Sequence, residues 1–129
     1  MAIEVYTKIL NDKARIPTCG SATAAGYDLY AATDYVTIIP PHSTVKVGTG
    51  LAFELPLGTF GAIFARSGLA TKKGLRPANC VGIIDSDYRG EIIVALHNDT
   101  EATQAIEPHE RIAQFVIFPA FQLNFIEAE

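Results

Sequence analysis

The strongest constraint on the fold is an alternation of apolar and polar side chains that recurs in short stretches. It occupies residues 3–9, 43–55, 91–98 and 111–118, each rich in Val, Ile, Phe or Tyr. A period of two predicts strands with one buried face. Turn residues such as Gly, Pro, Asn and Asp separate these stretches at short intervals, which is typical of sandwich, jelly-roll or barrel folds. We therefore expect an all-β domain.

One short helix and one unusual strand complete this prediction. Residues 67–74 indicate a helix, and Gly68 and Gly74 limit it to about two turns. Residues 91–98 are apolar on both faces, so the second face is either a subunit contact or part of a thicker core. With 129 residues, of which 49% are hydrophobic and 19% charged, the chain fits a single globular domain spanning residues 1–129.

Charge, hydropathy and cysteine content exclude several classes of protein. A formal net charge of −4 gives no basic field for nucleic-acid binding. No stretch reaches the roughly 18 apolar residues of a membrane-spanning helix, so we expect no membrane partner. Cys19 and Cys80 lack metal-site spacing, and we interpret both as reduced, buried structural thiols in a cytoplasmic protein.

A phosphate site is predicted where a strand leads into the short helix. Arg66, Ser67 and Gly68 combine a guanidinium, a hydroxyl and a backbone that a ligand oxygen can approach closely. The alternative is structural, with Ser67 as an ordinary helix N-cap and Arg66 exposed to solvent.

Two polar residues stand inside apolar strand sequences. Asp28 lies in an apolar strand two residues after Gly26, so its carboxylate needs a pair, a hydrogen bond or a nearby metal. Gln114 shares a strand face with Ile112 and Val116 and needs partners for its amide. For each residue, a structural pairing and a ligand contact stay open.

The stretch NCVGIIDSDYRGE, residues 79–91, places a carboxylate where an apolar strand meets a polar loop. Asp85 directly follows Ile83 and Ile84, a position that suits a general base because the strand end is fixed and partial desolvation raises proton affinity. A hairpin tip without function is the alternative. Tyr88 is unexplained by that alternative, since an exposed aromatic ring packs against another chain or offers a stacking face.

Four motifs occur in order: AGYDLYAA at 25–32, RSGLA at 66–70, VGIIDSDYRGE at 81–91 and ERIAQFVI at 110–117. In this order and spacing the chain resembles the homotrimeric deoxyuridine triphosphatases, or dUTPases. The resemblance implies a distorted jelly-roll or barrel-like all-β domain with one short helix, assembled as a homotrimer with active sites shared between subunits. It also implies an enzyme that hydrolyses dUTP to dUMP and pyrophosphate with Mg²⁺, limiting uracil in DNA and supplying dUMP for thymidylate synthesis.

The resemblance also implies roles for individual residues. Asp85 would activate the water that attacks the α-phosphorus, and Asp28 would support the Mg-triphosphate end without being a direct ligand. The phosphate-binding residues would be Arg66, Ser67, Gly68 and Gln114. Residues 79–90 would form a hairpin that reads the uracil and deoxyribose, through Asn79, Gly82, Ile84, Asp85 and Tyr88.

The family's fifth motif, a Gly-rich segment containing Arg, has no counterpart in these residues, which end in FQLNFIEAE. We expect a chain without that segment to fold, trimerise and recognise nucleotide while turning over slowly. Two alternatives to a dUTPase stay open. One is a dCTP deaminase-like enzyme of the same fold, and the other is a non-catalytic trimeric module that binds nucleotides or a protein partner.

Overall fold

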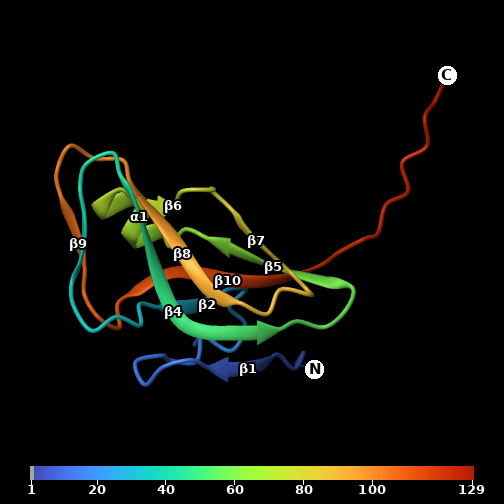
Figure 1. The fold of residues 1–129 in the computed structure, drawn as a ribbon, viewed down its shortest axis with the longest axis horizontal. Helices are drawn as coiled ribbons and strands as arrows, with labels where there is room; N and C mark the ends of the chain where they lie inside the picture. The colour runs from blue at the N-terminus through green and yellow to red at the C-terminus, as the bar shows by residue number, and fades with distance from the viewer. Residues whose placement is uncertain (1) are drawn as a thin grey trace.

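The computed structural model describes residues 2–129, which form three antiparallel sheets and one short helix (Figure 1). The helix α1 spans Ser67–Lys73. The mostly-β fold with one short helix is therefore confirmed. The strands are β1 (Tyr6–Ile9), β2 (Tyr27–Tyr30), β3 (Thr37–Ile39), β4 (Thr44–Glu54), β5 (Thr59–Phe64), β6 (Leu75–Pro77), β7 (Gly82–Asp85), β8 (Glu91–Asn98), β9 (Gln104–Ile106) and β10 (Arg111–Pro119).

Two four-stranded sheets contain most of the strands. One has the order β1-β4-β8-β6 and the other β2-β10-β5-β7, while β3 and β9 form a separate pair. The two larger sheets share a hydrophobic core, in which the rings of Phe53 from β4 and Phe115 from β10 lie 5.1 Å apart. Alternating side chains from both sheets fill this core, as expected for a two-layer β fold. Both sheets are open in the described chain, so strand pairing does not close a barrel.

The four stretches of alternating side chains all contain strands. Those at 43–55, 91–98 and 111–118 correspond to β4, β8 and β10, while the stretch at 3–9 forms a strand only from Tyr6. The predicted helix is also confirmed. It ends at Gly74, whose φ of 65° is left-handed and whose N–H donates to the carbonyl of Ala70.

The outer face of β8 is uncovered in the single chain. Ile92, Val94 and Leu96 are fully or almost fully buried, whereas Ile93 on the opposite face is 43% exposed. The thicker-core alternative is therefore wrong for the single chain. A subunit contact remains the prediction for this face.

After β10 the chain runs away from the sheets as an extended segment, the C-terminal arm, residues 121–129 (Figure 1). Just before the arm, the N–H of Ala120 donates a hydrogen bond to the carbonyl of Gly58. The arm carries four large apolar side chains that are all strongly exposed, and Phe125 is 88% exposed. A run of this kind needs a partner surface to remove it from water.

Both cysteines are free, which agrees with reduced thiols, but both are exposed. The expectation of buried structural thiols is therefore wrong, because Cys19 and Cys80 lie in loops outside the core. Among residues 2–129, no helix combines the length and the hydropathy needed to cross a membrane.

Candidate active site

Three neighbouring strands bring Asp28, Arg66 and Gln114 together. Gln114 in β10 lies opposite Asp28 in β2 on one side and opposite Phe64 in β5 on the other. Arg66 lies two residues after the end of β5, and its Nε donates to Oδ1 of Asp28 at 3.1 Å. The Asp28 side chain is only 18% exposed, so the ion pair satisfies a carboxylate that would be costly to bury alone.

Arg111 joins this cluster and was missed in the sequence reasoning. Its Nη1 lies 3.6 Å from Oδ2 of Asp28, and its side chain is 54% exposed. The available signal was its position at the start of the strand that carries Gln114. Two guanidinium groups around one carboxylate leave a net charge of +1, which favours an anionic ligand.

Gly26 makes room for the Gln114 side chain. A Cβ on Gly26 would collide with Oε1 of Gln114. The Nε2 of Gln114 donates to the carbonyl of Ala65 at 3.1 Å, next to Arg66. The Gln114 amide is therefore held against the segment that leads from β5 into α1. This hydrogen bond fulfils the predicted structural pairing and does not exclude the predicted ligand contact.

The start of α1 differs from the predicted N-cap. Arg66 occupies the N-cap position without a side-chain capping bond, and Ser67 is the first helical residue. The Ser67 N-cap and the solvated Arg66 are therefore both wrong. Ser67 is exposed, and a Cβ on Gly68 would meet no atom within 4 Å. Backbone and hydroxyl donors at 67 and 68 thus face open space beside Arg66.

The segment that carries Asp85 is not a hairpin. β7 pairs with β5, with Asp85 opposite Phe60 and Gly82 opposite Ile63, whereas β8 belongs to the other sheet. The predicted hairpin of residues 79–90 is therefore wrong, because β7 finds its partner in a distant strand. Asp85 is exposed at the end of β7, so the single chain does not provide the desolvation expected for it.

Tyr88 folds back onto its own loop. Its hydroxyl donates to the carbonyl of Glu91 at 2.8 Å, and a Cβ on Gly90 would lie 2.6 Å from that hydroxyl oxygen. The N–H of Tyr88 donates to the carbonyl of Asp85 at 3.1 Å. One turn thus joins the backbones of Tyr88 and Asp85, and the Tyr88 residue is 42% exposed.

Asn79 lies just before β7 and is exposed. Its Nδ2 would be 3.3 Å from a Cβ on Gly82, so the missing side chain lets the amide lie against the strand. Ile84 is half-buried and packs against the hydrophobic core. The residues predicted to read the base therefore come from one strand and the turn before it.

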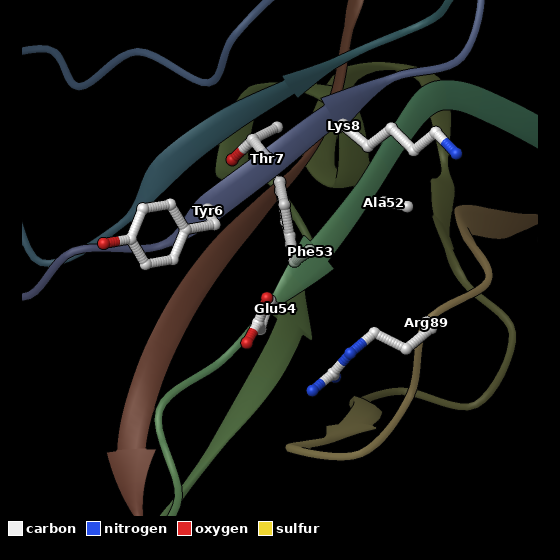
Figure 2. Close-up of a pocket in the computed structure, with 7 residues that line it drawn as sticks. All are labelled: Tyr6, Thr7, Lys8, Ala52, Phe53, Glu54 and Arg89. Carbon is white, nitrogen blue, oxygen red and sulfur yellow. The ribbon is translucent and has the colours of Figure 1, made fainter.

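The described chain does not bring all predicted site residues into one pocket. Two grooves of the described chain are lined by other side chains. One groove, of about 500 Å³, lies between β1, β4 and Arg89 (Figure 2), and the other, of about 480 Å³, lies between residues 2–7 and β10. The predicted residues instead form two separate groups, one around Asp28 and the other around Asp85.

A protein-only metal cage is also absent among residues 2–129, where no three His, Cys, Asp or Glu side chains gather. Both carboxylate oxygens of Asp28 face guanidinium groups. Such an arrangement suits a metal ion that is bound mainly by phosphate oxygens and water molecules, as Mg²⁺ commonly is.

Comparison with known proteins identifies the family. The family model described as dUTPase matches residues 12–129. The chain belongs to the dUTPase family. The resemblance drawn from the four motifs is thereby confirmed, and so is the prediction of a hydrolase of this family.

Proteins similar to this dUTPase-family chain include a bacterial enzyme, a yeast enzyme and a phage protein of known structure. The deoxyuridine 5'-triphosphate nucleotidohydrolase of Desulfitobacterium hafniense is 48% identical over 123 residues, covering 94% of this chain and 82% of the relative. The enzyme of the same name from Candida albicans is 43% identical over 116 residues, covering 90% of this chain and 69% of the relative. The solved dUTPase of Staphylococcus bacteriophage 80alpha with dUPNHPP has a TM-score of 0.91 at 26% identity, covering 99% of this chain and 89% of that chain.

Proposed function

We propose that this chain hydrolyses dUTP to dUMP and pyrophosphate through in-line attack of a water, activated by Asp85, on the α-phosphorus. The cationic cluster of Arg66, Asp28 and Arg111 carries the proposal, in a chain 48% identical to a named deoxyuridine 5'-triphosphate nucleotidohydrolase. In the cell this reaction would limit uracil incorporation into DNA and supply dUMP for thymidylate synthesis.

The phosphate chain would be held by Arg66, Ser67, Gly68 and Gln114. The bond to Asp28 uses Nε of Arg66, which leaves the Nη groups for phosphate oxygens in the fork geometry that arginine favours. Open space at Gly68 lets an oxygen approach the backbone N–H. These donors would be in place before charge develops in the transition state.

Mg²⁺ would enter with the triphosphate as part of the substrate. When bound, it supplies charge neutralisation at the phosphate oxygens. Asp28 would act indirectly, because its oxygens already bind Arg66 and Arg111. Its role is to orient the two guanidinium groups toward the phosphates.

Asp85 would accept the proton of the attacking water. Pairing with Phe60 and the hydrogen bond from Tyr88 N–H to its carbonyl fix its backbone. A general base must lie within about 2.6–3.2 Å of the water it deprotonates. Because Asp85 is exposed in the single chain, substrate and a second subunit would have to exclude bulk water.

Uracil would be read by the Asn79 amide and the backbone of Gly82 and Ile84. A cytosine edge reverses donors and acceptors, so buried groups would stay unpaired, a penalty that can reach a factor of ~10⁴. The Tyr88 ring, held by its bond to Glu91, would lie under the deoxyribose and leave no room for a 2′-hydroxyl.

A complete site requires a second copy of the chain. Gln114 lies opposite Phe64, and Asp85 opposite Phe60, four residues away along β5 and on its other side. The two residues are therefore separated by about 13 Å along the strands and two strand spacings of about 4.8 Å across them. Neighbouring phosphates of one nucleotide do not span this distance. We therefore propose that Asp85 of one subunit works with Arg66 and Gln114 of another.

Two surfaces support a trimer in which such sites are shared. The outer face of β8 exposes Ile93, and the C-terminal arm exposes Phe121, Leu123 and Phe125. Burial against neighbouring subunits would remove both from water. The proposal includes jelly-roll connectivity, a single domain over residues 1–129, and a cytoplasmic location that suits two unpaired thiols.

The deciding experiment compares the parent chain with Asp85→Asn, incubated with each deoxynucleoside triphosphate and Mg²⁺. Asp87→Asn is the matched control, because Asp87 is an exposed carboxylate in the same loop. Pyrophosphate should be released from dUTP, and Asp85→Asn should slow the rate by about 10²–10⁴, the usual contribution of a general base. Asp87→Asn should stay near the parent rate.

Other outcomes would select the alternatives. Ammonia released from dCTP would identify a deaminase of the same fold. Nucleotide binding without hydrolysis in the parent chain would identify a non-catalytic module. Equal turnover of dUTP by the parent and Asp85→Asn would contradict the proposed role of Asp85 as the general base. It would not contradict the assignment of dUTP as the substrate.

A further inference from the structure

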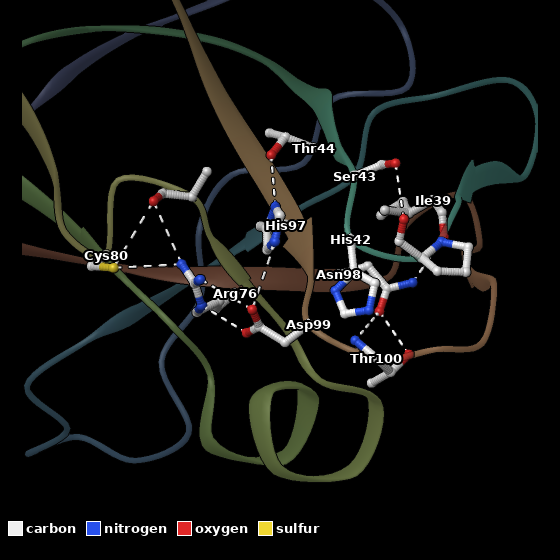
Figure 3. Close-up of polar contacts among 12 residues, drawn as sticks. Ile39, His42, Ser43, Thr44, Arg76, Cys80, His97, Asn98, Asp99 and Thr100 are labelled. Atoms are coloured by element: carbon white, nitrogen blue, oxygen red, sulfur yellow. Dashed lines mark hydrogen bonds and ion pairs between the residues drawn. The ribbon is translucent and has the colours of Figure 1, made fainter.

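Arg76 and Asp99 form a two-point ion pair beside the base-reading segment (Figure 3). Arg76 lies in β6, and Asp99 follows β8. Nε of Arg76 donates to Oδ2 of Asp99 at 2.7 Å, and Nη2 donates to Oδ1 at 3.1 Å. The fork geometry fixes the plane of the guanidinium as well as its position.

The remaining terminal nitrogen of Arg76 faces the 77–80 turn, the four residues before β7 that include Asn79. Nη1 lies 3.4 Å from the carbonyl oxygen of Pro77, 3.5 Å from that of Ala78 and 3.5 Å from Sγ of Cys80. One cation thus contacts the turn on both sides of Asn79.

The 77–80 turn needs such support. Cys80 has a φ of 67°, a left-handed conformation that L residues other than Asn and Asp rarely adopt. Backbone bonds close the turn, from Cys80 N–H to Pro77 O at 3.0 Å and from Val81 N–H to Asn79 O at 2.7 Å. The Asn79 side chain is left exposed at its tip.

The ion pair is a charged contact over a wide pH range. The hydrogen bond from Arg76 lowers the pKa of Asp99, and the same bond raises the pKa of Arg76. Nε2 of His97 lies 3.7 Å from Oδ1 of Asp99, and Nδ1 of His97 shares a hydrogen bond with the Thr44 hydroxyl at 2.9 Å. Asp99 is thereby tied to β4 and β8 of the scaffold.

We propose that Arg76 is a positioning residue for base recognition, which holds the 77–80 turn so that Asn79 presents its amide to the base, with Asp99 holding Arg76. The proposal rests on the proposed function of Asn79. Among the described residues, the hydrogen bonds and ion pairs of Arg76 go to Asp99 and to the 77–80 turn, and none goes to Asp85 or to the proposed phosphate-binding residues. Arg76 would therefore act on selectivity for the base and leave the chemical step unchanged.

The main test is Asp99→Asn, because it loosens Arg76 without removing the positive charge. KM for dUTP should rise about tenfold, and kcat should stay within about twofold of the parent value. This pattern indicates that binding is weakened equally in the ground state and the transition state. The preference for dUTP over dCTP should fall about tenfold, because a mobile amide no longer penalises the wrong edge. Arg76→Gln should produce the same split.

Lys13→Gln is the matched control. Lys13 makes a long surface ion pair with Asp34 at 3.9 Å, away from the turn. It should leave KM and base preference at parent values. A general loss of folding would lower kcat and thermal stability together, and circular dichroism melting of each variant separates that result from positioning.

A second readout needs no nucleotide. In a Cys19→Ser background, Cys80 is the remaining thiol, and its alkylation rate reports the geometry of the turn. Asp99→Asn should change this rate at least about threefold, although the charge of Arg76 is retained. If the parent does not hydrolyse dUTP, the proposed function fails while this measurement still tests the turn. An unchanged alkylation rate, or a changed rate with unchanged base preference, overturns the proposal.

Discussion

Gly68→Ala should make the protein slightly more stable and much less active. Gly68 is the second residue of α1, and a Cβ there would meet no atom within 4 Å of the chain. Its φ is outside the left-handed region, so alanine adopts this backbone without strain. Nothing in the folded chain therefore requires glycine at this position, whereas the proposed phosphate contact with this backbone would.

The expected magnitudes have opposite signs. Alanine in place of glycine within a helix stabilises by up to about 1 kcal/mol. Because α1 has seven residues and Gly68 lies near its start, we expect about 0.5 kcal/mol, or a rise in Tm of about 2 °C. A Cβ in the phosphate path would displace the oxygen from the backbone N–H. Losing one such donor costs about 10²–10³ in rate, so kcat/KM for dUTP should fall about 100-fold.

Pyrophosphate release and thermal melting measure both effects on the same samples. Gly20→Ala is the control, because its Cβ would also meet nothing within 4 Å and Gly20 lies outside the helix. That variant should change activity little. Parent-like turnover by Gly68→Ala would refute the phosphate role of this backbone. A marked loss of stability would show that protein atoms of a neighbouring subunit occupy the space.

Three further outcomes are expected. Gly26→Ala should lower kcat/KM about tenfold and stability by about 1 kcal/mol, measured by kinetics and melting, since the new Cβ displaces the Gln114 amide. Leu123→Ser in the C-terminal arm should shift the assembly toward smaller species in light scattering, because 71% of this side chain is exposed in the single chain. Asp99→Asn should lower Tm at pH 7, and its difference in Tm from the parent should shrink as the pH falls below 3.8. The bond from Arg76 lowers the pKa of Asp99 from 3.8, so its stabilisation is complete above that value and is lost as pH falls through the folded pKa.

The sequence predicted the strands and the helix end that depend on interactions between residues close together in the chain. The strand at 91–98 alternates buried and more exposed residues along its whole length, and the strand at 44–54 does so in its first half. The helix end at Gly74 follows from a left-handed φ. β3 and β9 were not predicted. Each has three residues, too few to show a period, and their pairing joins distant parts of the chain.

The sequence predicted which residues belong to the candidate site better than it predicted how they are arranged in space. Sequence reasoning left open whether Asp28 pairs with a cation or supports a ligand. The structure pairs Asp28 with Arg66, and its support of a ligand stays a prediction. Arg111 was missed because its one available signal, a place at the start of the strand that carries Gln114, does not distinguish it from other exposed arginines. The hairpin of residues 79–90 was wrong because the register of β7 against β5 is a long-range choice that turn residues do not encode.

The separation of Asp85 from Arg66 and Gln114 leads to a prediction about mixed assemblies. If each site takes Asp85 from one subunit and Arg66 from the next around a closed ring, a chain with Asp85→Asn and a chain with Arg66→Gln can complete each other. In trimers formed at random from equal amounts, about a quarter of the interfaces join an intact Asp85 to an intact Arg66.

Refolding or co-expressing the two inactive variants should therefore restore up to about a quarter of the parent activity, while simply mixing preformed assemblies should restore none until subunits exchange. Arg66→Gln also removes the partner of Asp28, so its folding has to be checked by melting first. Arg111→Gln can replace it if it fails, since Arg111 faces the same carboxylate and is more exposed. Activity no higher than the sum of the separate variants would place Asp85 and the phosphate cluster in the same subunit, which the four-residue offset along β5 opposes.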